Sequence, residues 1–388
     1  MIIKRKIAFD LVPNQPGTGG AGGGIWTYVS NLVTCIDRRV SEDIEITCFV
    51  SKPSSFAFNT IKCIEVPIRC DSLIKRLLWV HLLLPLWCLR HKVALLHKFA
   101  SEIPLVSACP IAINVNDFMA EYYLDDKGDI REFLSGTDLL RLTYFKFMQW
   151  YAFKVTRMVF FLTQAIADEA IERYHPKKER LVVAYAGVHT PDDSLVHTNN
   201  CGKNLLYIAA FHPHKGHIRA IECVEEYFRH FSQSHDDTKL IFQGNVFNKK
   251  YFEAVRKRIE ASPFSNRITI KQYDKNLTLN DIYADAAAVL LLSEYEGFGL
   301  PVIEAQASGI PVVCSDIPVF REIAGESVLL VNSGKPYETA EKIASLIDNE
   351  SLRTQVIAKG FVNSKRFTWD STAACIIETY QTVFSKDD

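Results

Sequence analysis

The sequence lacks the signatures of several protein classes. It has no charge excess, because 44 Lys and Arg oppose 45 Asp and Glu for a net charge of −1. A nucleic-acid-binding protein usually carries a basic surplus, so this class is not favoured. Apolar residues make up 48% of the chain and charged residues 23%, a balance that excludes a mainly disordered protein. The 388 residues predict two or three domains.

Motifs for metal and redox chemistry are also missing. The ten cysteines form no Cys-x-x-Cys pair, and no Asp-x-Asp motif occurs. Most cysteines stand in apolar runs such as residues 46–50. Small buried thiols in a reducing compartment are therefore expected, with neither a zinc site nor a bound cofactor. This favours a cytoplasmic location.

No stretch has the length of a membrane-spanning helix, and the N-terminus lacks the apolar core of a signal peptide. The longest apolar run covers residues 77–89 and is interrupted by His81 and Pro85. Basic residues flank it, and Trp79 and Trp87 lie within it. Such a helix fits an anionic membrane surface, with residues 75–92 making the contact. A buried helix of the first domain is the alternative.

Short apolar stretches alternate with helical patterns along most of the chain. A first series of strands is expected at residues 7–10, 44–50, 111–115, 158–163 and 181–184. A polar, turn-rich segment at 189–203 then suits an interdomain linker. A second series follows, with strands at 205–210, 239–243, 268–272, 288–292, 312–314 and 328–331, and helices at 217–234, 301–308 and 336–348. This alternation predicts two doubly wound α/β domains that bind ligand at the carboxyl ends of their strands.

The stretch Glu294-Tyr-Glu-Gly-Phe-Gly-Leu-Pro301 follows one of these buried strands. Pro301 suits the first turn of a helix, so the preceding loop presents backbone N–H groups at a helix N-terminus, where phosphate binds. Carboxylates this close to an anion need hydroxyl groups to accept from, and a nucleotide sugar supplies them. The predicted donor-binding residues here are Glu296, Gly297, Phe298, Gly299, Leu300 and Glu304.

Glu296 and Glu304, separated by seven residues around Gly-Phe-Gly-Leu-Pro, resemble the signature of the retaining GT-B glycosyltransferases of the GT4 family. The resemblance extends through Gly309-Ile-Pro and Glu322-Ile-Ala-Gly, and weaker matches favour the mannosyl- and rhamnosyltransferase-like branch. It implies an acceptor-binding Rossmann-like domain over residues 1–190 and a donor-binding one over 191–368. It also implies a final helix at 369–388 that crosses back to the first domain.

A second match is residues 207–216, which resemble the basic loop of the family. Lys215 stands where the family has the lysine that neutralises the donor diphosphate, and the resemblance makes Lys215 and Glu296 predicted catalytic residues. Many members also have an arginine nearby, but this chain has Ala210 and His214 at those positions. His214 or His212 is the candidate replacement.

Six of the 18 glycines fall within residues 17–24. They contain a dinucleotide-binding pattern, but no acidic residue follows the second strand to hold a ribose, so NAD binding is not expected. The resemblance instead implies that Gly23 and Gly24 belong to a turn facing the donor phosphates and the acceptor. Asn116 and Asp117 stand where the branch often has His-Asp, which makes them predicted catalytic residues; a strand-end turn is the alternative.

The resemblance implies a metal-independent hexosyltransferase with a nucleoside-diphosphate sugar as donor, with GDP-mannose favoured. The implied acceptor is a glycan or lipid-linked glycan of cell-surface polysaccharide, used at the inner face of the cytoplasmic membrane. No nucleic-acid partner is expected. Two alternatives remain open, a non-catalytic GT-B partner subunit and a nucleotide-sugar epimerase of the same fold.

Overall fold

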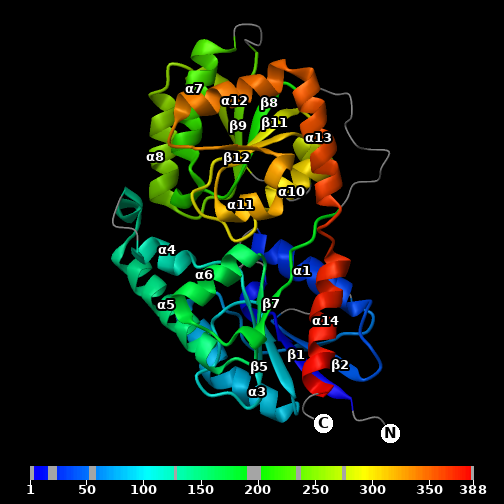
Figure 1. Ribbon diagram of the computed structural model, residues 1–388. Helices are drawn as coiled ribbons and strands as arrows, with labels where there is room; N and C mark the ends of the chain where they lie inside the picture. Colours follow the sequence, from blue (N-terminus) through cyan, green and yellow to red (C-terminus); the bar gives the residue numbers. More distant parts are fainter. Residues whose placement is uncertain are drawn as a thin grey trace. The chain divides into compact units, whose positions relative to one another are not determined.

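The computed structural model describes residues 4–15, 24–51, 58–125, 129–189, 202–232, 237–272 and 277–385. The chain forms two compact units (Figure 1). The first unit contains residues 1–124, 136–187 and 368–388, and the second contains residues 125–135 and 188–367. The chain therefore passes between the units at 187/188 and 367/368, beside the expected boundaries, and also makes an excursion at 125–135 that the sequence did not predict.

The first unit is built on a seven-stranded parallel sheet in the order β3-β2-β1-β4-β5-β6-β7. Its strands are β1 (Arg5–Asp10), β2 (Ile44–Val50), β3 (Lys62–Glu65), β4 (Leu95–Lys98), β5 (Ile111–Val115), β6 (Met158–Phe161) and β7 (Leu181–Val183). Its helices include α1 (Gly24–Asp37), α4 (Met119–Asp125), α5 (Gly136–Val155), α6 (Gln164–Tyr174) and α14 (Trp369–Ser385). The C-terminal helix α14 packs on α1, where the rings of Trp369 and Tyr28 lie 5.7 Å apart.

A long interrupted helix connects β3 to β4 in this unit. It consists of α2 (Leu73–Leu78), a π-helical turn η3 (Trp79–Leu83) and α3 (Leu84–Arg90). Pro85 explains the wide turn, because it has no N–H and its ring would clash with the carbonyl of residue 81 in a regular α-helix. One face of this helix is buried and the other exposed. The buried face fits the alternative of a buried helix in the first domain, which does not account for the exposed apolar face.

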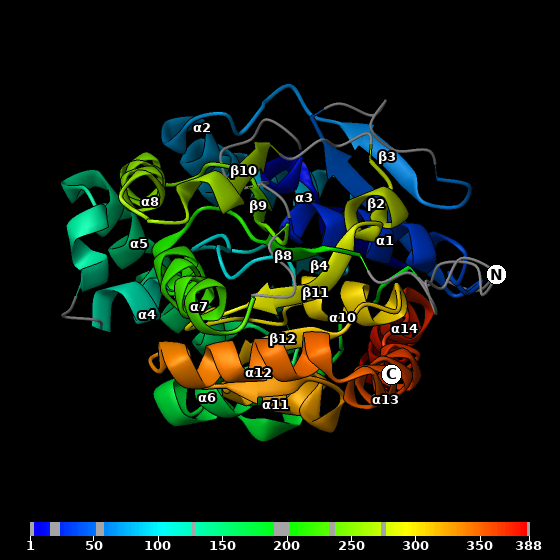
Figure 2. The same cartoon turned by 90° about the horizontal axis from the view of Figure 1, so that it is seen from above.

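The second unit is built on a six-stranded parallel sheet in the order β10-β9-β8-β11-β12-β13. Its strands are β8 (Asn204–Ile208), β9 (Leu240–Gly244), β10 (Ile268–Gln272), β11 (Ala286–Leu291), β12 (Val312–Ser315) and β13 (Leu329–Val331). Its helices are α7 (His217–His230), α8 (Lys249–Glu260), α9 (Leu279–Tyr283), α10 (Leu300–Ala307), α11 (Pro318–Ile323), α12 (Pro336–Asp348) and α13 (Glu350–Ser364). Helices α7 and α12 lie side by side on this sheet (Figure 2). The two sheets confirm the predicted pair of doubly wound α/β domains.

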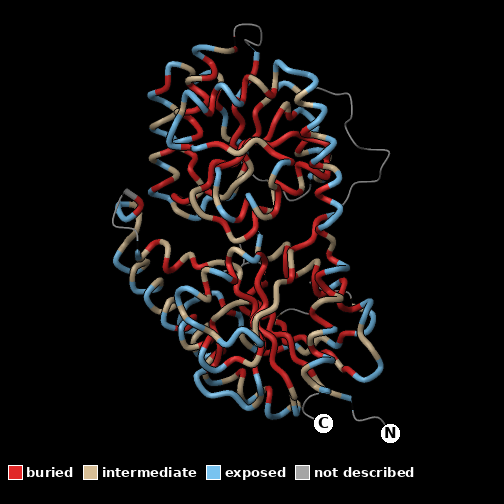
Figure 3. The backbone as a smooth tube through the Cα atoms, viewed as in Figure 1, coloured by how far each residue is buried: buried red, intermediate tan, exposed pale blue. Residues whose placement is uncertain are grey.

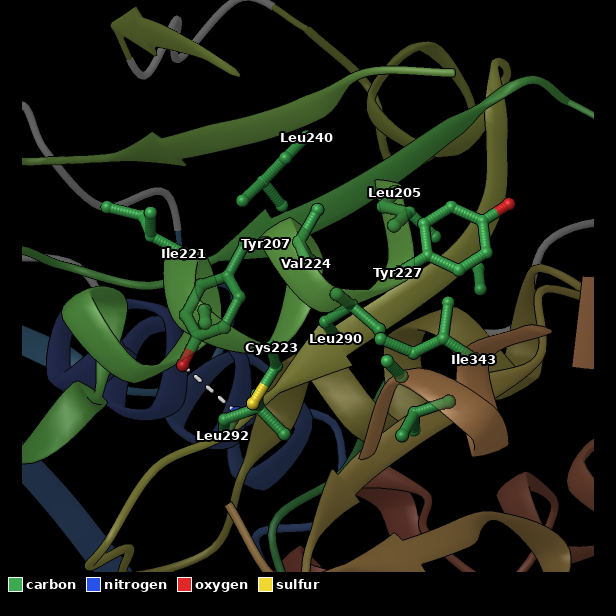
Figure 4. Close-up of a cluster of buried hydrophobic side chains, with 14 of the residues drawn as sticks. Leu205, Tyr207, Ile221, Cys223, Val224, Tyr227, Leu240, Leu290, Leu292 and Ile343 are labelled. Carbon is green, nitrogen blue, oxygen red and sulfur yellow. Dashed lines mark hydrogen bonds between the residues drawn. The ribbon is translucent and has the colours of Figure 1, made fainter. Parts of the chain in front are cut away.

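Burial is concentrated in the strands, which run as almost continuous buried segments through each unit (Figure 3). Parallel strands covered by helices on both faces are apolar on both sides, as the stretch Ala-Ala-Ala-Val-Leu-Leu of β11 illustrates. In the second unit, strands β8, β9 and β11 and helix α7 contribute the centre of one core cluster (Figure 4). This core fixes the strand ends from which the site loops leave.

The excursion at 125–135 docks on the second unit through a short helix, η4 (Asp129–Phe133). The ring of Phe133 packs edge-on against Tyr251 at a centroid distance of 5.2 Å. Its carbonyl accepts a hydrogen bond of 3.0 Å from the Asn248 side chain, and Asn248 also caps α8. The excursion is thus an integral part of the second unit.

Candidate active site

The site of the second unit is made by two loops that leave neighbouring strands. Strands β8 and β11 are parallel neighbours, with Leu206 paired to Val289. Their carboxyl ends therefore lie at the same edge of the sheet. The loop after β8 contains a single 3-10 turn, η7 (Pro213–Lys215), and the loop after β11 leads into α10. These are the two loops that the sequence marked as donor-binding.

The Tyr207 hydroxyl forms hydrogen bonds with both loops. Its buried hydroxyl accepts a hydrogen bond of 3.0 Å from the Leu292 N–H (Figure 4) and donates one to the Lys215 carbonyl. A further bond of 2.8 Å runs from the Glu294 N–H to the His214 carbonyl. The backbone on either side of Lys215 is thereby tied to the start of the second loop.

Gly216 permits this close approach. Its φ of +65° lies in the left-handed region, and a Cβ at this position would lie 2.2 Å from the Leu292 carbonyl oxygen. Any other residue would separate the loops or strain the turn. The glycine after the lysine is therefore a requirement of the geometry.

Replacement of Tyr207 by phenylalanine is expected to destabilise the second unit by about 1–3 kcal/mol, because the Leu292 N–H loses its buried acceptor. Lys215 should also lose part of its positioning, so activity should fall while the chain still folds. Thermal unfolding and transfer assays check both effects. Tyr227→Phe is the matched control, since Tyr227 is a buried tyrosine of the same core and lies near the C-terminal end of α7. Equal destabilisation by the two substitutions would contradict the role of Tyr207 in holding the two loops together.

Lys215 and Glu296 form an ion pair at this edge. The Lys215 Nζ lies 2.7 Å from the Glu296 Oε1, and the two side chains are only 20% and 8% exposed. Low exposure limits screening by solvent, so the charges interact strongly. The pair places a cation that can hold a phosphate beside a carboxylate that can accept from a hydroxyl. These two predicted residues, 81 positions apart in the chain, are brought together.

His214 does not supply a second positive charge. It is buried, and burial together with the neighbouring Lys215 charge holds its pKa well below the ordinary value for histidine. The side chain is therefore neutral in the empty site, and His214 stays a predicted replacement for the arginine as a hydrogen-bonding group rather than as a second cation. The His212 ring stacks on Phe247 at 5.3 Å and on His214 at 5.4 Å.

The second loop ends at Gly299, the N-cap residue of α10. Its φ of +92° requires glycine, and a Cβ there would meet the Phe320 ring at 2.5 Å. Pro301 lies in the first turn of α10, where its missing N–H costs no helical hydrogen bond. Phe298 is buried and contacts Phe367, with centroids 5.6 Å apart. The loop containing Gly297 and Leu300 therefore leads into a helix N-terminus, as expected.

Glu304 lies one turn into α10. Its Oε2 accepts a hydrogen bond of 3.4 Å from the Tyr283 hydroxyl, and burial raises the pKa of Glu304 to about 7. The carboxyl group is therefore poised to change charge near neutral pH. A ligand that donates hydrogen bonds to it would favour the ionised form.

The remaining predicted residues belong to the first unit. Asp117 forms an Asx turn just before α4, because its Oδ1 accepts from the Met119 N–H at 3.0 Å, which fits the alternative of a strand-end turn. Asn116 follows β5, and its Oδ1 is buried with no hydrogen-bond partner among the described residues. Gly24 begins α1. Gly23 and the earlier glycines of the cluster lie outside the described residues.

Two residues near the ion pair were missed by the sequence reasoning. Arg219, in the first turn of α7, lies 3.2 Å from the Glu294 carboxylate. Its position four residues after Lys215 was the only signal in the sequence. Ser293 lies between the β11 end and Glu294, and its buried Oγ has no hydrogen-bond partner within the described part of the chain. Both side chains add polar groups to this edge.

No group of three or more His, Cys, Asp or Glu side chains is arranged to hold a metal ion within the described ranges. The nine described cysteines are free thiols, and six of them are buried. Among the described residues, no helix combines the length and hydropathy needed to span a bilayer.

Solved structures of glycosyltransferases share this fold over nearly the whole chain. WaaG, a glycosyltransferase of lipopolysaccharide biosynthesis, aligns with a TM-score of 0.71 and 15% identity over 96% of this chain and 99% of its own. HepE of Anabaena, solved with UDP and glucose, aligns with a TM-score of 0.69 and 16% identity, covering 97% of this chain and 100% of its own. The fold is the GT-B fold of glycosyltransferases, as the sequence predicted.

Sequence comparison also finds relatives among glycosyltransferases. Residues 197–361 match the family model described as "Glycosyl transferases group 1". The O-antigen chain mannosyltransferase RfbU of Salmonella typhimurium is 24% identical over 374 residues, which span 92% of this chain and 97% of RfbU. O-antigen chain mannosyltransferase B of Escherichia coli is 32% identical over 100 residues, about 26% of each protein. Residues 197–361 are thus similar to the group 1 glycosyltransferases, and the whole chain is similar to RfbU.

Proposed function

We propose that this chain is a glycosyltransferase that moves a hexose from a nucleoside-diphosphate sugar to an acceptor hydroxyl with retention of anomeric configuration, as in the GT4 family. The observation that carries the proposal is the Lys215–Glu296 pair beside the N-terminus of α10. Lys215 and the helix end would bind the diphosphate, and Glu296 would accept from hydroxyls of the sugar. Glu304 would accept from the ribose.

The proposed chemistry depends on the leaving group. Glu296 is engaged by Lys215 and Glu294 by Arg219, which does not favour either carboxylate as the nucleophile of a double displacement. We therefore infer a front-face route in which the departing diphosphate takes the acceptor proton. Lys215 and the α10 amides would stabilise the charge that develops on the diphosphate, so no metal would be needed. Neutral His214 would donate a hydrogen bond without adding charge.

Residues of the first unit would serve the acceptor. The unpartnered Asn116 Oδ1 is suited to accept from a sugar or acceptor hydroxyl. Asp117, through its hydrogen bond to the Met119 N–H, would hold that turn in place. Gly23 and Gly24 would let the donor phosphates approach the backbone closely. Asn116 cannot take a proton as a histidine would, which is consistent with proton transfer to the diphosphate.

GDP-mannose is the proposed donor, because the relative that aligns over nearly the full chain is called a mannosyltransferase. The test is a thermal-shift screen of GDP, UDP, ADP and TDP, followed by transfer assays with the matching sugar nucleotides. GDP should stabilise the chain most, and the product should be a glycoside. Release of a free sugar or its isomer would instead indicate an epimerase. Absence of stabilisation by every nucleotide would indicate a non-catalytic subunit.

A glycan or lipid-linked glycan of a cell-surface polysaccharide is the proposed acceptor, supported by the O-antigen assignment of the relatives. Such an acceptor would be met at a membrane. We propose that residues 75–92 contact the anionic inner face of the cytoplasmic membrane, and their exposed apolar face supports this contact.

Nucleotide affinity should rise as the pH increases from 6 to 8. Glu304 has a pKa raised to about 7 in the empty protein, and a ribose donates to the ionised form, so binding releases a proton below pH 7. The raised pKa of Glu304 also makes the stability of the fold depend on pH. The contribution of this carboxyl group to stability is fully present below its pKa in the unfolded chain, and it is lost as the pH rises through 7. Titrations with GDP at several pH values measure the effect.

The matched variants are Glu304→Gln and Glu326→Gln, the second at an exposed glutamate of the same unit. Glu304→Gln should reduce the pH dependence of GDP affinity, and it should weaken GDP binding at pH 8. Glu326→Gln should behave as the unchanged chain. A pH dependence that survives Glu304→Gln would assign the titration to another group.

A further inference from the structure

The exposed apolar side chains are concentrated in one part of the first unit. Seventeen large apolar side chains are exposed among the described residues, and twelve of them lie between positions 73 and 155. Single exposed apolar residues are normal, whereas a group of this size marks an interaction surface.

The helix formed by α2, η3 and α3 contributes the first row. Trp79, Leu84 and Cys88 are buried on one face. The opposite face repeats every three or four residues, which keeps it on one side of the helix. Its members, between 41% and 79% exposed, are Ile74, Leu78, Leu82, Leu86 and Leu89.

Helix α5 contributes the second row beside the first. Its Tyr144 hydroxyl lies 2.8 Å from the His81 Nε2, and its Tyr151 hydroxyl donates to the Leu105 carbonyl at 2.6 Å. Exposed Leu140 and Phe147 share a helical face with these two tyrosines, because positions 140, 144, 147 and 151 follow the helical repeat. The two rows, with exposed Leu105 and Val106 between them, are called here the two-helix surface.

A buried charged cluster holds the two rows together. Glu102 is buried and accepts from the Arg76 Nε at 2.5 Å and from the Tyr144 hydroxyl at 3.0 Å. Arg76 belongs to α2 and Tyr144 to α5, so the buried Glu102 carboxylate links the two helices. The two helices that carry the exposed apolar side chains are therefore held in place relative to each other.

The charged residues of these helices are mostly basic, and two of them are paired, Lys75 with Asp71 and Arg76 with Glu102. Residues 73–92 and 136–157 contain eight Lys and Arg against a single acidic residue, Asp138, in a chain whose net charge is −1. Exposed Arg90, Lys92, Arg141 and Lys154 lie at the ends or along the flanks of the two helices. An apolar face with basic flanks complements an anionic lipid surface, because the apolar side chains can contact the acyl chains and the basic side chains can contact the headgroups.

We propose that the two-helix surface, and not the segment 75–92 alone, docks this protein on an anionic lipid bilayer. The inference extends the contact proposed above and does not require the transfer reaction. Phe147 and Trp150, 49% and 45% exposed with centroids 5.8 Å apart, form its aromatic edge, which suits the headgroup region.

The test is co-sedimentation of the full chain with vesicles of phosphatidylethanolamine, with and without phosphatidylglycerol. Binding should require phosphatidylglycerol and weaken at high salt. The double variants Leu82→Glu/Leu86→Glu and Phe147→Ser/Trp150→Ser should each bind at least about tenfold more weakly, because each withdraws two apolar side chains from the lipid. Val362→Glu, at a 70% exposed position of the second unit, is the matched control and should bind normally.

Nucleotide-induced thermal stabilisation is measured on every variant, because it reports on the second unit. Absence of this thermal stabilisation would count against the proposed function and would not affect the conclusion about binding to vesicles. Three results would overturn the docking proposal. The unchanged chain could fail to bind anionic vesicles, or Phe147→Ser/Trp150→Ser could bind them as the unchanged chain does. Light scattering could also show a dimer that Leu82→Glu/Leu86→Glu converts to a monomer, which would assign the surface to a second copy.

Discussion

Lys215→Ala is expected to abolish sugar transfer and to weaken binding of the nucleoside diphosphate. A hydrogen bond to a charged group contributes about 1.5–3 kcal/mol, which corresponds to roughly 10- to 100-fold in affinity. Charge develops on the diphosphate as the sugar leaves, so the loss in turnover should be larger, about 100-fold or more. Calorimetric titration with GDP and a transfer assay measure the two losses separately.

Lys335→Ala, at an exposed position of the same unit, is the control for a general effect of removing a positive charge. Lys215→Arg should recover part of the binding, because the charge is kept while the geometry changes. Full activity of Lys215→Ala would remove Lys215 from the site. Equal loss in both alanine variants would attribute the effect to net charge.

Glu296→Gln is expected to separate transfer from binding. In the empty site the Glu296 carboxylate neutralises Lys215 at 2.7 Å, so donor phosphate and carboxylate compete for the same ammonium group. Removing the carboxylate charge should leave nucleoside diphosphate binding unchanged or make it several-fold tighter. Transfer should nevertheless fall by about 100-fold or more, because the sugar loses a charged acceptor for its hydroxyls.

The informative quantity is the contrast between these two variants in the same assays. Lys215→Ala should lose binding and transfer together, whereas Glu296→Gln should lose transfer alone. Weaker GDP binding by Glu296→Gln would contradict the competition. It would show that the carboxylate supports the nucleotide site instead of opposing the phosphate.

Much of the fold follows from the sequence because parallel strands buried on both faces are apolar throughout. The elements β5, β10 and α12 have the predicted bounds. Strand β4 was missed since it ends in His97 and Lys98. Both side chains are buried, and Lys98 is neutralised by Asp10 of β1. That pairing depends on strand order, which a local pattern does not contain.

The site shows the same division between local and tertiary information. The loop before α10 was predictable, because glycine and proline report their backbone geometry directly. The neutrality of His214 was not, since burial comes from the packed second unit. The bond from Tyr207 to both loops also depends on β8 and β11 being neighbours. Arg219 was overlooked because nothing in a helical arginine indicates that it faces Glu294.

The division of the chain between the units has a consequence for folding during synthesis. The second unit is complete once residue 367 has emerged, because it takes only residues 125–135 and 188–367. The first unit needs residues 368–388 as well, and Tyr380 of α14 reaches the His97 ring, with which it hydrogen-bonds. Domains generally fold as units when their residues become available. The unit that begins the chain is therefore the last to close, and a ribosome-bound chain lacking α14 should contain a folded second unit beside an unfinished first one.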